Sequence, residues 1–120
     1  MFRNILFVAL GGSLGSIFRY LFSLLLTFKK FPFATFSVNI IGSFFIGLFM
    51  GYVSKQIHNQ SWQLLLIVGV CGGFTTFSTF SWDIILMLQE QRFGTAIFYI
   101  FSTIFLGILF AYLGFIVKTY

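Results

Sequence analysis

Charged side chains are scarce in this sequence of 120 residues, where Asp, Glu, Lys and Arg together make up 8% and only two residues are acidic. Soluble domains contain roughly 25% charged residues, so a soluble fold of this length would lack the polar surface it needs. A single cysteine, Cys71, excludes a small domain stapled by disulfides. The short length excludes a multidomain enzyme.

Apolar residues, by contrast, are abundant. They make up 59% of the chain, and 20 of its residues are phenylalanine. Disordered chains are polar and poor in aromatic residues, so this composition excludes disorder as well. What remains is a small integral membrane protein.

The net charge of +5 raises the question of a nucleic-acid partner. The basic residues occur singly or as one pair rather than in a block, which is typical of connectors beside lipid head groups. We therefore predict contact with membrane lipid and no nucleic-acid partner. The basic residues are Arg3, Arg19, Lys29, Lys30, Lys55, Arg92 and Lys118.

Charged and polar residues divide the chain into four apolar stretches. Each exceeds the ~20 residues that a helix needs to cross the hydrocarbon core. The first stretch is longer than the apolar part of a signal peptide, and no small-residue cleavage site follows it, so we expect it to remain as a helix. We predict an all-α integral membrane protein with one four-helix domain over residues 1–120 and transmembrane helices at 4–28, 32–54, 62–89 and 93–117.

The basic residues give no preferred orientation. Three lie on each side of the predicted bundle: Arg3, Lys55 and Lys118 on one, and Lys29, Lys30 and Arg92 on the other. Since the Lys/Arg bias normally sets orientation, two interpretations stay open. Either a weak bias is decided by details outside this tally, or the chain inserts both ways and forms an antiparallel dimer with inverted-repeat symmetry.

Small and polar residues recur every four positions in two of the predicted helices, and so share a helix face. For the glycines in these stripes, close helix packing is the favoured reading. For the polar members, a line of hydrogen-bond donors through the membrane is equally favoured. The stripes are Thr35, Asn39, Ser43, Gly47 and Gly51 in the second helix, and Tyr99, Thr103, Gly107 and Ala111 in the fourth.

Two charged residues fall inside the predicted spans. Arg19 lies ten residues before Lys29, and Asp83 lies nine before Arg92, so they should reach a similar depth in two helices that run the same way. A charge inside a membrane needs a partner or water. Either Arg19 pairs with Asp83, or Arg19 borders a water-filled entrance and attracts an anion.

The stretch 69–83, GVCGGFTTFSTFSWD, predicts a locally broken third helix, because adjacent glycines and adjacent threonines disfavour a helix interior. Non-helical backbone at membrane depth is tolerated where it lines a cavity, and carbonyls freed there can coordinate a cation. Phe77 and Phe80 follow on one face, beside Thr76, Ser78 and Thr79. Aromatic ring edges are positive and can face a small anion.

Three motifs in order, GGSLGSIFRY (11–20), SVNIIGSFFIG (37–47) and GGFTTFSTF (72–80), together resemble the Fluc/CrcB fluoride-channel family along the whole chain. The resemblance implies an antiparallel dual-topology homodimer with two fluoride pores and a central structural sodium ion. It implies that the backbone carbonyls of Gly72 and Thr75 hold the sodium, and that Phe77 and Phe80 line the pores.

The resemblance also implies that Asn39 donates a hydrogen bond to fluoride and that Arg19 lies at a vestibule. Tyr99, Thr103 and Thr35 match the family's polar track. The chain departs from the family at Gly107, where relatives often carry a further hydroxyl, and at Asp83, where they often carry glutamate, so Asp83 receives no pore role.

We therefore expect a fluoride-selective channel in the cell (inner) membrane that exports fluoride passively and protects the cell from its toxicity. A small dual-topology multidrug transporter is the first alternative, but its first helix would need a carboxylate where this chain has Arg19. A non-conducting structural subunit is the second, and it leaves the polar stripes without a purpose. An enzyme is disfavoured because no catalytic cluster or phosphate loop is present in the sequence.

Overall fold

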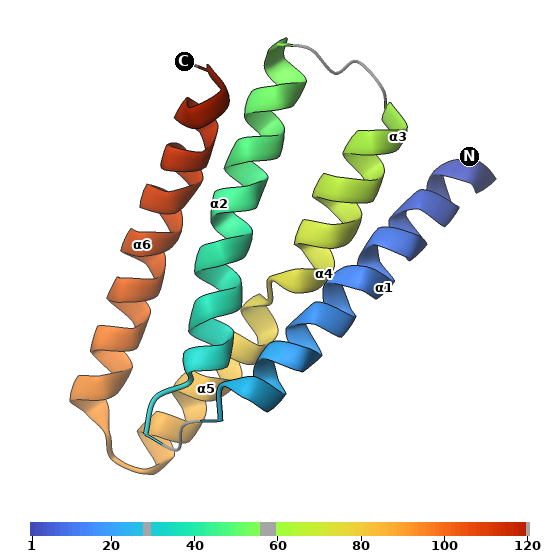
Figure 1. The fold of residues 1–120 in the computed structure, drawn as a ribbon. Helices are drawn as coiled ribbons and strands as arrows, with labels where there is room; N and C mark the ends of the chain where they lie inside the picture. Colours follow the sequence, from blue (N-terminus) through green and yellow to red (C-terminus); the bar gives the residue numbers. More distant parts are fainter. Residues whose placement is uncertain (28–29, 56–59, 120) are drawn as a thin grey trace.

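The computed structural model describes residues 1–27, 30–55 and 60–119, and the regular structure in those ranges is helical (Figure 1). Four segments are long and apolar enough to cross a membrane: Phe2–Leu25, Phe33–Val53, Gln60–Gln89 and Phe93–Val117. The four-span, all-helical architecture predicted from hydropathy is therefore present. Residue 28, the predicted end of the first span, lies outside the described residues.

The first, second and fourth of these segments are single helices, whereas the third segment is built from four pieces. The single helices are α1 (Phe2–Leu25), α2 (Phe33–Lys55) and α6 (Phe93–Thr119). The third segment consists of α3 (Gln60–Gln63), the wider π-helical turns of η1 (Leu64–Cys71), α4 (Gly72–Phe74) and α5 (Phe77–Gln89). Figure 1 shows the two chain ends at the same end of the bundle, as four crossings require.

The third segment is interrupted at two residues. Thr75 has φ −84° and ψ 154°, and Thr76 has φ −152° and ψ 120°, so both are extended. The sequence analysis gave the adjacent glycines the same weight as the adjacent threonines in predicting the break, but Gly72 and Gly73 are helical in α4. Helix α5 starts again at Phe77, where the Thr76 hydroxyl caps it by accepting from the Thr79 N–H at 3.1 Å.

Helices α2 and α6 lie side by side (Figure 1), and glycines allow their backbones to touch. A Cβ added at Gly47 would lie 1.9 Å from the Ala111 carbonyl oxygen, and one at Gly114 would lie 2.1 Å from the Phe44 carbonyl oxygen. A larger side chain at either position would push the helices apart. For Gly47 and Ala111, the stripe positions therefore serve close packing.

Helix α1 crosses η1 and α4 through glycines on both sides. A Cβ at Gly11 would meet the Leu65 carbonyl oxygen at 2.2 Å, and one at Gly69 would meet the Gly11 Cα at 2.7 Å. Further along α1, a Cβ at Gly15 would meet the Val70 carbonyl oxygen at 2.3 Å. This contact fixes the first half of the third segment before its interruption.

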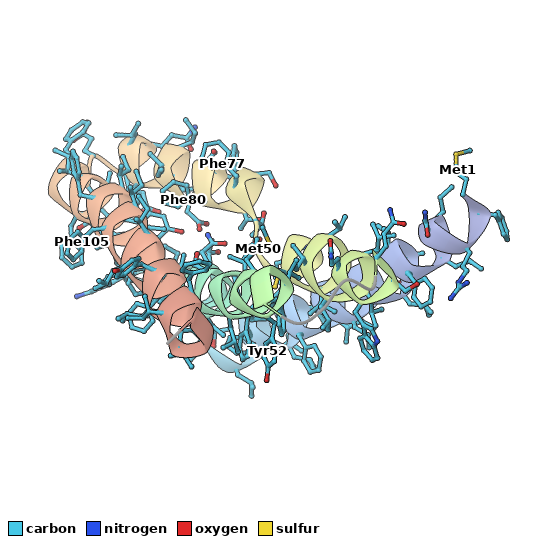
Figure 2. The ribbon with its side chains drawn as sticks, turned by 90° about the horizontal axis from the view of Figure 1, so that it is seen from above. Met1, Met50, Tyr52, Phe77, Phe80 and Phe105 are labelled. Atoms are coloured by element: carbon cyan, nitrogen blue, oxygen red, sulfur yellow. The ribbon has the colours of Figure 1, made fainter. Side chains whose placement is uncertain are left out.

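A cluster of buried side chains lies between α5 and α6. Tyr99 is fully buried, and Phe80, Met87 and Ala96 pack around it. The outer surface is apolar, as in Phe105 on the outer side of α6 (Figure 2), which is 66% exposed. Apolar residues on the outside are what a bundle surrounded by lipid requires.

Candidate functional site

Asn39 on α2 holds the interruption of the third segment. Its Oδ1 accepts from the Thr76 backbone N–H at 2.9 Å, and its Nδ2 donates to the Thr76 carbonyl at 3.2 Å. The amide therefore replaces the helical partners that extended backbone loses. A primary amide has two N–H groups, so one donor remains after these two bonds are made.

The same bonds leave the backbone carbonyls of Gly72 and Thr75 without their helical N–H donors. In an unbroken helix, the Thr76 N–H would donate to Gly72 and the Thr79 N–H would donate to Thr75. Here they donate to the Asn39 side chain and the Thr76 hydroxyl instead. The carbonyls of Gly72 and Thr75 lose these helical donors, and both residues line one cavity.

That cavity, called the large cavity below, has a volume of about 740 Å³ and lies along the interruption between α2, η1, α5 and α6. Most of its wall is apolar. Its lining includes Asn39, Gly42, Ser43, Cys71, Gly72, Thr75, Thr76, Phe77, Phe80, Thr103 and Gly107.

Thr103 is the notable polar group of the large cavity. It is 8% exposed, and its Oγ1 has no hydrogen-bond partner within the ranges that the structure describes. A buried hydroxyl without a partner costs free energy, of the order of 1–3 kcal/mol. The Oγ1 atom itself is covered, so Thr103 keeps an unused hydrogen-bond donor just behind the cavity wall.

A second cavity, called the arginine cavity below, has a volume of about 330 Å³ and lies between α1, α2 and the start of α5. It is lined by Arg19 together with the hydroxyl residues Ser16, Tyr20, Ser23, Thr35, Thr76 and Thr79, and by Ala34 and Val38. Among these described lining residues there is no carboxylate, which makes the cavity suited to an anion. Thr76 borders both cavities.

Arg19 and Asp83 take different partners, although similar depths had made them a candidate ion pair. Arg19 donates through Nε to the Gly73 carbonyl at 3.1 Å. Asp83 accepts from the Tyr99 hydroxyl at 2.9 Å. The structure therefore does not pair these two side chains; Arg19 lines the arginine cavity with a backbone carbonyl as its anchor, and its attraction of an anion stays a prediction.

Phe77 and Phe80 lie near each other on α5, with their ring centroids 5.9 Å apart. Phe80 is 6% exposed and packs on Tyr99 at 4.9 Å between centroids, whereas Phe77 is 78% exposed. Figure 2 shows the Phe77 ring at the outer side of α5. The chain by itself therefore encloses one of the two rings.

Of the other predicted site residues, some line one of the two cavities and others lie outside both. Thr35 and Thr79 border the arginine cavity. Ser78 lies outside the lining of both cavities, and its hydroxyl is 3.1 Å from the Thr76 hydroxyl. Tyr99 is committed to Asp83, so the fourth-helix stripe places Thr103, but not Tyr99, in the large cavity. Sequence reasoning gave no role to the Gly73 carbonyl or to Asp83 as the partner of Tyr99, since no local pattern marks either contact.

Comparisons with known proteins match this chain along nearly its full length. The family described as CrcB-like protein, Camphor Resistance (CrcB), matches residues 6–115. The fluoride-specific ion channel FluC of Flavobacterium psychrophilum is 43% identical over 119 residues, which cover 96% of each chain. The proteins of the same name from Agrobacterium fabrum and Oceanobacillus iheyensis are 41% and 42% identical, covering 92% and 93% of this chain and 92% and 88% of theirs. The resemblance inferred from the three motifs is confirmed, and the chain is a multi-pass membrane protein that belongs to the CrcB family.

Proposed function

We propose that this protein is a fluoride-selective ion channel that lets fluoride leave the cell passively and so protects it from fluoride toxicity. The names of its relatives support the choice of ion. The observation that carries the proposal within the chain is the pair of cavities that both border Thr76, one lined by Arg19 and the other by Thr103, whose buried hydroxyl has no partner in the described chain.

Fluoride would enter at the arginine cavity. The Nε of Arg19 donates to the Gly73 carbonyl, and the guanidinium has further N–H donors beyond this bond. A positive charge beside a narrow opening raises the local concentration of an anion. Thr35 and Thr79 add hydroxyl groups along the same wall.

The ion would then pass the interruption into the large cavity. There the second N–H of Asn39 and the hydroxyl of Thr103 offer donors, and the ring edges of Phe77 and Phe80 offer weak positive charge. The hydroxyls of Thr76 and Ser78 lie beside this passage, and Tyr99 continues the polar line behind Phe80. Selective conduction requires several weak sites that replace water without trapping the ion.

We infer that the working unit is an antiparallel homodimer with the two chains inserted in opposite directions. Two observations support it. The basic residues are balanced at three on each side, and the exposed ring of Phe77 projects beside a mostly apolar cavity that a second copy would close. In that dimer, the interruption of the third helix would lie near the midplane and face its copy.

A structural sodium ion fits between the copies. Freed backbone carbonyls are the groups that coordinate sodium in interrupted membrane helices. Gly72 and Thr75 offer two such carbonyls, since the N–H groups that would occupy them donate elsewhere. When bound, the ion supplies positive charge near the anion path.

The direct test is flux through the purified protein. Liposomes loaded with potassium fluoride, or with potassium chloride as the control, would be given valinomycin, and anion efflux followed with an ion-selective electrode. We expect fast fluoride efflux and no chloride efflux. A well-folded dimer that releases neither ion would overturn the proposal and favour the non-conducting membrane subunit.

A further inference from the structure

Ser43 is a polar residue of the large cavity that has no role in the proposed path so far. It lies on α2 one turn after Asn39, is half-buried, and lines the same cavity as Thr103. A Cβ added at Gly107 would lie 3.5 Å from the Ser43 Oγ. The Ser43 hydroxyl on α2 therefore occupies the space beside Gly107 on α6.

The polar side chains on this face of α6 end at Thr103, because Gly107 one turn later has no side chain. Thr103 lines the cavity and its hydroxyl is buried without a partner in the described chain, and the next residue on the same helix face is Gly107. Without another donor there, an ion leaving Thr103 would meet apolar wall. Ser43 reaches that point from the opposite helix.

We propose that Ser43 is an anion-contacting residue of this channel and supplies the hydroxyl that Gly107 does not. This inference rests on the proposed fluoride path through the large cavity. In this path, the polar line crosses from α6 to α2 between Thr103 and Ser43, rather than continuing along α6.

The Ser43 hydroxyl can be released for such a contact. It donates to the Asn39 backbone carbonyl at 2.6 Å. Within α2 that carbonyl also faces the Ser43 backbone N–H, its regular helical donor. Turning the hydroxyl toward an anion therefore leaves the carbonyl with a partner, and a hydrogen bond to a charged acceptor is the stronger one.

The test is a rescue experiment with three variants, using fluoride efflux from liposomes that contain the full-length protein. Ser43→Ala should slow efflux about tenfold, since one hydrogen bond to the ion is lost. Gly107→Ser is the single-variant reference for the double variant, and it should fold, because its added Cβ would lie 3.5 Å from the Ser43 Oγ, an ordinary van der Waals contact. The double variant should return to within about threefold of wild type, because the hydroxyl is again at the same place.

Ser13→Ala is the matched control. The Ser13 hydroxyl makes the same kind of bond, to the Ala9 carbonyl at 2.8 Å, but it is exposed on α1 and outside both cavities. It should conduct like wild type. Slowing by Ser13→Ala equal to that by Ser43→Ala would overturn the inference, because loss of the helical side-chain bond would then explain both.

Three further outcomes decide the matter. Wild-type efflux from Ser43→Ala would overturn the inference while leaving the channel function intact. A double variant as slow as Ser43→Ala would also overturn it, since Ser43 would then act through Asn39 alone. If Ser43→Ala does not fold, Ser43→Cys keeps the size and replaces the hydroxyl by a weaker donor. Wild-type efflux from that variant would overturn the inference.

Discussion

Asn39 and Thr76 are joined by two hydrogen bonds, with Oδ1 accepting from the Thr76 N–H at 2.9 Å and Nδ2 donating to the Thr76 carbonyl at 3.2 Å. This pair ties α2 to the point where the third segment leaves the helix. One amide side chain thus satisfies both backbone groups of an extended residue at a depth where water is scarce.

Asn39→Asp should reduce fluoride efflux more than about tenfold while the oligomeric state of the protein stays that of wild type. The carboxylate cannot donate to the Thr76 carbonyl, and its charge repels both that carbonyl and the ion. Efflux from liposomes and size-exclusion chromatography measure the two effects. Asn4→Asp, in the first turn of α1, is the control and should leave efflux unchanged. Rapid efflux through Asn39→Asp would remove Asn39 from the path.

Phe80→Ile should also slow fluoride efflux without disrupting assembly. Isoleucine keeps much of the buried volume beside Tyr99, but it has no ring edge to present to an anion. Phe105→Ile, at an exposed position on the outer side of α6, is the matched control. If both variants conduct like wild type, the ring of Phe80 has no part in conduction.

Gly11→Ala and Gly12→Ala should affect stability in opposite directions although the residues are adjacent. A Cβ at Gly11 would meet the Leu65 carbonyl at 2.2 Å, whereas one at Gly12 has nothing within 4 Å. We expect Gly11→Ala to destabilise by about 1–3 kcal/mol through overpacking, and Gly12→Ala to stabilise by up to ~1 kcal/mol through helix propensity. Thermal unfolding in detergent measures both, and equal shifts would contradict the close α1–η1 packing.

Arg19→Gln should slow fluoride efflux most at low ionic strength. The guanidinium acts on the ion through an aqueous opening, where salt screens charges over about 10 Å at 0.1 M. Comparing efflux at low and high concentrations of an impermeant salt measures this. Arg3→Gln is the control, because Arg3 lies over the Phe7 ring at 5.7 Å near the start of α1. A deficit that salt leaves unchanged would assign the effect to the lost Gly73 bond instead.

Sodium should raise the thermal stability of the purified protein. A ligand that binds the folded state stabilises it by RT ln(1 + [L]/Kd), and the proposed ligands are the Gly72 and Thr75 carbonyls. Unfolding would be followed in sodium chloride and in N-methylglucamine chloride of equal ionic strength. Equal midpoints at every concentration would argue against a sodium site.

Sequence reasoning reached the membrane architecture because hydropathy is a local property. A stretch of about 20 apolar residues crosses lipid as a helix whatever its neighbours are, since only that conformation satisfies its own backbone. The glycines and threonines of 69–83 likewise pointed to irregular backbone. They did not locate it, because Gly72 and Gly73 are helical and the extended residues are Thr75 and Thr76.

The sequence by itself therefore determined the four apolar helices, the family, and the set of polar residues that lie in them. The tertiary structure decided how those residues are paired: Arg19 with the Gly73 carbonyl, Asp83 with Tyr99, and Asn39 with Thr76. These partners are 54, 16 and 37 residues apart. Which groups meet depends on the rotation and depth of each helix against its neighbours, which the close contacts at Gly11, Gly47 and Gly114 set and which no local pattern encodes.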